Sequence, residues 1–133
     1  MKHLTHATAA AAVVAGLVAT GASVAPAHAS GGDSARVTRS GTCDHARWSI
    51  KAKEDDGRIE VEAEIDSNRS GQTWTWVLAH NGSRSATGKA RTAGRSGSFS
   101  IERRLPDARD SDTFTFKATH GSQVCTARVR YPA

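Results

Sequence analysis

Residues 58–66 alternate between apolar and acidic side chains with a period of two. The apolar positions are Ile59, Val61, Ala63 and Ile65, and the acidic positions are Glu60, Glu62, Glu64 and Asp66. Successive side chains of a β-strand point to opposite faces, so this pattern separates the two kinds of side chain cleanly. We therefore expect a half-buried antiparallel strand here, with its carboxylates in solvent.

A second alternating run precedes this strand, and charge fixes how the two pair. Trp48, Ile50 and Ala52 alternate with polar residues, and Asp56-Gly57 is a preferred two-residue hairpin turn. That turn sets Asp55 opposite Arg58, Lys53 opposite Glu60, Lys51 opposite Glu62, and Arg47 opposite Asp66. A four-residue turn would lose two of these opposite-charge pairs. The acidic row is thus predicted to form ion pairs; a calcium site is the alternative, although a straight row does not converge on one ion.

The rest of the chain continues in short strands. We expect them at Thr73–His80, Ser83–Thr92, Ser98–Leu105, Asp112–Thr119 and Ser122–Tyr131. Asn81-Gly82 is a strong hairpin signal, and Gly88 marks the second of these strands as an edge strand with a bulge. The pattern predicts an all-β fold: a seven-stranded antiparallel β-sandwich, immunoglobulin- or fibronectin-like. A small closed barrel is the competing architecture.

The first residues have the pattern of a secretory signal peptide. A short positive region precedes an uncharged Ala-rich run, and Ala27-His28-Ala29 is a cleavage signal. We expect cleavage after Ala29 and export by the general secretory route, because no Arg-Arg pair precedes the run. A retained membrane anchor is the alternative; after cleavage no transmembrane segment is expected. The predicted organisation is a signal peptide at 1–29, a flexible Gly/Ser-rich leader at 30–42 and the sandwich domain at 43–133.

The mature chain has little apolar material for a core. Leu, Ile, Val and Phe make up only 14 of its 104 residues. In an oxidising compartment Cys43 and Cys125 are expected to form a disulfide, since the first and last strands of such sandwiches often lie side by side. The bridge would stabilise the domain by roughly 4–5 kcal/mol. Two free thiols, a metal pair and a catalytic Cys43 beside His45 are the alternatives.

Several segments of the chain resemble a group of short secreted actinomycete proteins of uncharacterised function. The resemblance rests on residues 48–53, 55–61, 65–69, 71–74 and 80–82, with Gly41-Thr42-Cys43 and Cys125. An excess of Arg over Lys, 13 to 4 in the mature chain, fits a GC-rich genome. The resemblance implies an exported β-protein, and it implies no catalytic or binding residues.

The sequence holds no recognisable catalytic motif. It lacks a nucleophile elbow, a zinc-protease helix and a phosphate loop. His45, His80 and His120 fall at strand ends or turns, where we expect them to be solvated. We therefore predict no enzyme activity, no catalytic residues and no cofactor. The one weak metal candidate is a calcium site at a turn containing Asp107, Asp110 and Asp112.

Two features suggest binding. Trp74 and Trp76 share one face of a strand, as an exposed aromatic platform or, as we favour, as core. A basic tract is the second feature; it comprises Arg84, Lys89, Arg91, Arg103 and Arg104, with Arg128 and Arg130 as further members. Its partners would be an anionic cell-wall polymer, a polysaccharide or phospholipid head groups. Nucleic acid is not expected, because no aromatic side chains interleave with the arginines.

These features predict a secreted, non-catalytic interaction module of the extracellular space or cell envelope. The first alternative is an inhibitor of an extracellular hydrolase, which would contact that other protein through the loop at Ala93–Gly97 or the one at Ala108–Asp112. A small hydrolase is the last alternative.

Overall fold

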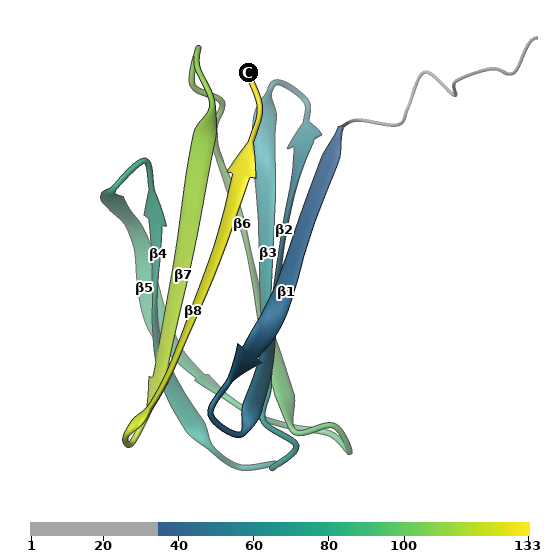
Figure 1. Cartoon of the computed structure of the whole chain (residues 1–133), viewed down its shortest axis with the longest axis vertical. Helices are drawn as coiled ribbons and strands as arrows, with labels where there is room; N and C mark the ends of the chain where they lie inside the picture. The colour runs from purple at the N-terminus through teal and green to yellow at the C-terminus, as the bar shows by residue number, and fades with distance from the viewer. Residues whose placement is uncertain (1–34) are drawn as a thin grey trace, which may run out of the picture.

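The structure, a computed structural model, describes residues 35–133, and the predicted signal peptide lies outside the described residues. The fold consists of eight β-strands and the turns between them (Figure 1). The strands are β1 (Arg36–Cys43), β2 (Ala46–Asp55), β3 (Arg58–Asp66), β4 (Thr73–His80), β5 (Ser83–Arg91), β6 (Ser98–Pro106), β7 (Asp112–His120) and β8 (Gln123–Tyr131). Within residues 35–133 there is no helix that could cross a membrane.

The strands form two four-stranded antiparallel sheets packed face to face. The first sheet has the order β1-β2-β3-β6 and the second has the order β5-β4-β7-β8. The chain crosses between the sheets after β3, β5 and β6, as in Greek-key sandwiches. The predicted all-β sandwich is thus confirmed, with eight strands in place of seven.

The additional strand, β1, lies where the sequence predicts a flexible leader. Arg36–Cys43 pairs in register with Ala46–Lys53 of β2, so these residues belong to the folded domain, which was predicted to begin at Cys43. The leader prediction at 30–42 is wrong for this stretch. Most side chains of the edge strand β1 face solvent, so its sequence does not alternate between apolar and polar residues. The strand is held chiefly by its backbone hydrogen bonds to β2.

The hairpin of β2 and β3 has the predicted register at every position. Lys51 pairs with Glu62 and Lys53 with Glu60, and each lysine Nζ lies 3.2–3.3 Å from the carboxylate opposite. Both turn residues, Asp56 and Gly57, have positive φ, as the two-residue hairpin turn requires. Charge pairing and turn chemistry together therefore determined this register.

The core lies between the sheets and is built from the inward residues of every strand except β1 and β5. The largest fully buried side chains include Trp74, Phe114, Phe116 and Ile50. On β5 the inward positions hold only Ala86, Gly88 and Ala90, and the register with β4 shifts between Leu78 and Ala79. The predicted bulged edge strand is confirmed.

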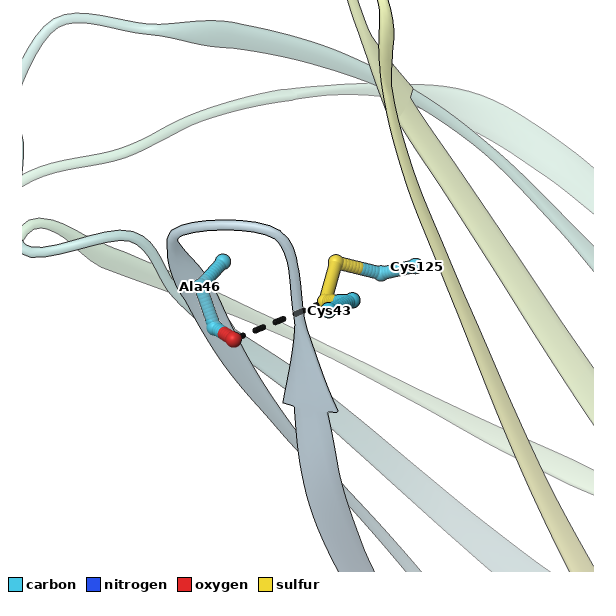
Figure 2. Close-up of a disulfide and its surroundings, with 3 residues drawn as sticks. All are labelled: Cys43, Ala46 and Cys125. Atoms are coloured by element: carbon cyan, nitrogen blue, oxygen red, sulfur yellow. Dashed lines mark hydrogen bonds between the residues drawn. A yellow bond between two sulfur atoms is a disulfide. The ribbon is translucent and has the colours of Figure 1, made fainter.

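A disulfide joins the sheets at one open side of the sandwich. Cys43, the last residue of β1, is bonded to Cys125 of β8, as predicted (Figure 2). The two strands lie side by side (Figure 1). Cys125 is buried, and the Sγ of Cys43 lies 3.7 Å from the carbonyl oxygen of Ala46. The bridge therefore holds the edge strand β1 against the second sheet.

Candidate functional site

The outer face of the second sheet has a larger net positive charge than the outer face of the first sheet. Successive side chains of a strand point to opposite faces of the sheet, so the strand register shows which residues lie on this face. The basic side chains of this face are Arg84, Lys89 and Arg91 on β5, Lys117 on β7, and Arg128 and Arg130 on β8. All six are exposed. We call this surface the basic face.

The other side chains of the basic face are small and mostly hydroxylated. They are Thr73, Thr75, Val77, Ala79, Thr87, Thr113, Thr115, Thr119, Val124 and Thr126. The Thr87 hydroxyl donates to the carbonyl of Trp76, and the other threonine hydroxyls bond to no residue in 35–133. None of the strand residues on this face is acidic. The face therefore offers uncompensated positive charge among free hydroxyl groups.

The outer face of the first sheet, in contrast, carries equal numbers of basic and acidic residues. Its basic residues are Arg36, Arg47, Lys51, Lys53, Arg58 and Arg104, and its acidic residues are Asp55, Glu60, Glu62, Glu64, Asp66 and Glu102. Several of these are paired directly, as in the ion pair of Arg104 with Asp55 at 2.7 Å. The charges of this face cancel locally, so the positive charge of the domain is concentrated on the second sheet.

The structure divides the predicted basic tract. It brings Arg84, Lys89 and Arg91 onto one face with Arg128 and Arg130, and it excludes Arg103 and Arg104. The last two lie on β6, which belongs to the first sheet. Including Arg103 and Arg104 in a single basic face was therefore wrong.

Arg103 and Arg104 have structural contacts of their own. The guanidinium of Arg103 lies over the ring of Trp76, 5.1 Å from its centroid, at an inward position of the edge strand β6. It covers the core between β5 and β6 through a cation–π contact. Arg104 points to the outer face of the first sheet and is paired with Asp55.

Lys117 completes the basic face, and sequence reasoning missed it. It stands alone among Thr and Phe in β7, and its register partner Thr126 is uncharged. Only the order of strands in the sheet places it between the basic residues of β5 and β8. No local signal in the sequence could have identified it.

Trp74 and Trp76 do not form an exposed platform. Trp74 is fully buried and Trp76 is 3% exposed. Trp76 stacks on Phe116 with ring centroids 5.9 Å apart, and Trp74 packs against Phe99. The favoured core placement is confirmed, and the platform alternative is wrong because both indoles are needed to fill a core with few large apolar residues.

The Asp-rich turn is not built as a calcium site. Asp112 is fully buried, whereas Asp107 and Asp110 are exposed. In residues 35–133 the one group of three converging carboxylates is Glu60, Glu62 and Glu102, on the outer face of the first sheet. Glu60 and Glu62 are already paired with lysines. The calcium prediction at residues 107, 110 and 112 is therefore wrong, because the first residue of β7 turns its carboxylate into the protein.

Asp112 holds the end of the sandwich together. One of its carboxylate oxygens, Oδ1, bonds to the Nε2 of His80 and accepts a hydrogen bond from the backbone N–H of Ala108. The imidazole of His80 stacks on Phe114 with centroids 4.7 Å apart. His80 is therefore half-buried and not solvated as expected. No serine or cysteine of the described chain hydrogen-bonds to this imidazole, so the pair lacks the nucleophile of a catalytic triad.

The other two histidines differ from each other. His45 is exposed in the turn between β1 and β2, as expected. His120 bonds through Nδ1 to the carbonyl of Thr73 and lies 5.4 Å from the ring of Trp74. This contact ties the end of β7 to the start of β4.

Two ionisable groups near Asp112 have shifted pKa values. The pKa of Asp107 is raised above 3.8 by partial desolvation, by hydrogen bonding with Asp112 and by the charges of Asp112 and Glu54, against the lowering effect of His80. The second oxygen of Asp112, Oδ2, is buried and has no hydrogen-bond partner within residues 35–133. Burial and the charges of Glu54 and Asp107 also raise the pKa of Tyr131 above 10.0.

The loop at residues 93–97 is tied to the rest of the fold. The Gly97 carbonyl accepts hydrogen bonds from the backbone N–H and the hydroxyl of Ser67. The hydroxyl of Ser70 donates to the Gly94 carbonyl, and a side chain on Gly97 would overlap the backbone of Arg69. These contacts hold the loop to the connection between β3 and β4.

Comparison with protein-family models, with curated proteins and with solved structures finds no match to this chain.

Proposed function

We propose that the protein is a secreted, non-catalytic module that binds an anionic polymer of the cell envelope or extracellular space through the basic face. One observation carries this proposal. The outer face of the second sheet holds six exposed basic side chains, and none of the strand residues that point to this face is acidic, whereas the charges of the opposite face cancel.

The charge distribution favours binding over solubility as the role of these residues. A surface that merely keeps a protein soluble mixes both signs of charge, as the first sheet does. A flat patch of one sign attracts a polyanion over a distance of about 8–10 Å at moderate ionic strength, and arginine pairs well with carboxylate and phosphate oxygens. The six basic side chains are spread over three strands of one sheet face, which suits an extended polymer better than a small molecule.

The disulfide supports the proposed location. Cys43 and Cys125 are bonded at the edge of the sandwich, and such bridges persist mainly in oxidising compartments. Export through a signal peptide cleaved after Ala29 is part of the same proposal.

The proposal is tested by retention on isolated cell envelope. The purified protein is mixed with envelope, and the bound fraction is measured from low to high salt. We expect retention at low salt that is lost as salt rises, because the attraction between exposed charges is screened. No retention at low salt would refute the proposal.

A charge-matched pair of variants locates the site. The double variant Lys89→Glu with Arg128→Glu reverses two charges of the basic face, and Arg36→Glu with Arg39→Glu reverses two exposed charges on β1. Both lower the net charge of the protein equally. We expect the first to abolish retention and the second to preserve most of it. Equal loss in both would mean that net charge, and not the basic face, governs retention.

Inhibition of an extracellular hydrolase is the second candidate. The tethered loop at residues 93–97 favours it, because an inhibitory loop must be held in place and Ser67 and Ser70 do so here without a disulfide. A pull-down of secreted hydrolases with the protein, followed by activity assays, tests this function. Undiminished hydrolase activity at saturating protein would exclude it.

A further inference from the structure

The basic residues of the second sheet lie along a diagonal. On β4, Thr75 lies opposite Lys89 of β5 on one side and opposite Thr119 of β7 on the other. Lys117 lies two residues before Thr119 on β7. Lys117 in turn lies opposite Thr126, and Arg128 follows two residues later on β8. Each step moves to a further strand and further along the strands in the same direction.

Five of the six basic residues belong to this diagonal stripe. In order they are Arg91, Lys89, Lys117, Arg128 and Arg130. Strand and residue spacings place Lys89 about 12 Å from Lys117, and Lys117 about 8 Å from Arg128, while the full stripe extends about 30 Å. Arg84, the sixth, lies off the stripe, about 14 Å across the sheet from Arg128.

Threonine hydroxyls fill the gaps between the charges. Thr75 lies between Lys89 and Lys117, and Thr115 lies between Lys117 and Arg130. Both hydroxyls bond to no residue in 35–133, so they are free for a ligand. A ligand that matches this order presents charged groups and hydroxyl groups in turn along an extended chain. Polyphosphate has the charges and lacks the hydroxyls.

The geometry points to a linear acidic polysaccharide that lies along this diagonal, with Lys117 as its central contact. This inference rests on the proposed function of the basic face and narrows it to one class of polymer and one orientation. The ligand must reach from the corner at Arg91 to the corner at Arg130. A chain much shorter than about 30 Å leaves one end of the stripe empty.

A length series tests the orientation. Oligogalacturonates of increasing length serve as the probe, with polyphosphate of matched length as the comparison, and affinity is measured by calorimetry at low salt. We expect the affinity of each oligosaccharide to rise with its length until it extends about 30 Å, and to change little with further length. Oligogalacturonate is expected to bind more tightly than polyphosphate at equal length.

Two pairs of exposed variants test the path. Lys117→Ser is expected to weaken binding of the long oligogalacturonate about fivefold, and Arg84→Ser by less than about twofold, since an exposed ion pair contributes up to about 1 kcal/mol. Thr75→Val, on the stripe, is expected to weaken binding more than Thr126→Val, which lies beside it. Thermal unfolding of each variant confirms that the fold is kept.

The outcomes separate this inference from the function on which it rests. Equal effects of Lys117→Ser and Arg84→Ser, or equal affinity for short and long oligomers, would overturn the diagonal path. Tighter binding of polyphosphate would overturn the polysaccharide while leaving an anionic polymer as the ligand. Failure of both polymers to bind at low salt would overturn the proposed function itself.

Discussion

Gly88 of β5 lies directly opposite Trp76 of β4, and a methyl group on this glycine would come within 2.8 Å of the indole ring. The same relationship recurs in the first sheet, where Gly41 of β1 faces Trp48 of β2 and a methyl group would come within 2.6 Å. β1 and β5 are both edge strands. In each, a glycine leaves room for a tryptophan from the neighbouring strand.

The first prediction concerns Gly88→Ala. Glycine within a strand normally costs stability relative to alanine, about 0.5–1 kcal/mol, so the substitution would ordinarily help. Here we expect the free energy of unfolding to fall by about 1–3 kcal/mol, because the methyl group overpacks the indole of Trp76. Urea denaturation measures the change, with Ser85→Ala on the same strand as the control. A variant as stable as the wild type would show that the indole has room to move.

The second prediction concerns the disulfide. Replacing Cys43 and Cys125 by alanine is expected to lower the free energy of unfolding by about 4 kcal/mol, because the bridge closes a loop of 82 residues in the unfolded chain. Denaturant unfolding under oxidising conditions measures this. Hydrogen exchange should also show β1 opening first, since few of its side chains are buried. An unchanged unfolding midpoint would contradict the account of how β1 is held.

The third prediction concerns Asp112→Ala. This change removes the acceptor of the Ala108 N–H and the partner of His80, both in the part-buried end of the sandwich. Loss of a buried hydrogen-bonded carboxylate is expected to cost about 3–5 kcal/mol. Asp110→Ala, an exposed residue of the same turn, should change stability by no more than about 0.5 kcal/mol. Similar effects of the two substitutions, measured by thermal unfolding, would argue against a structural role for Asp112.

The fourth prediction concerns the pH dependence of Asp107→Asn. The pKa of Asp107 is raised in the folded protein, so the folded state binds this proton more tightly than the unfolded state. The contribution of Asp107 to stability is therefore present at acidic pH and lost as pH rises through its folded pKa. An asparagine amide stays neutral and can donate to Asp112 at all pH values.

We therefore expect Asp107→Asn to raise the Tm at neutral pH, and the difference from wild type to shrink as the pH falls toward 4. Thermal unfolding over a pH series measures this, with Asp110→Asn as the control. An equal Tm of variant and wild type at every pH would mean that the pKa of Asp107 is not shifted by folding, and a difference that grows at acidic pH would mean that it is lowered.

Local signals in the sequence were sufficient for part of this structure. The β2–β3 hairpin was predictable to the residue, because four opposite-charge pairs and an Asp-Gly turn all select one register. The pairing of Cys43 with Cys125 followed from the proximity of the first and last strands. The sequence did not predict β1. This strand is stabilised by backbone hydrogen bonds to β2 and by the disulfide to Cys125, and neither requires an alternating pattern of side chains in β1 itself.

The basic face depended on information that no local pattern contains. Arg103 and Arg104 follow the other arginines in sequence. The chain crosses to the first sheet after β5, so these two residues, on β6, lie in a different sheet from the basic face. Lys117 comes from a strand with no other charge on that face, and it becomes central only through its place between β4 and β8. Strand order, which is set by long-range packing, decides which charges meet.

The most direct test of the central claim is a map of the binding surface by NMR. Amide resonances of the labelled protein are followed during titration with a polyuronate at low salt. The account predicts shifts on the outer face of β5, β4, β7 and β8, centred on Lys117, with reversal at high salt. Shifts centred on the first sheet, or shifts that persist at high salt, would contradict it.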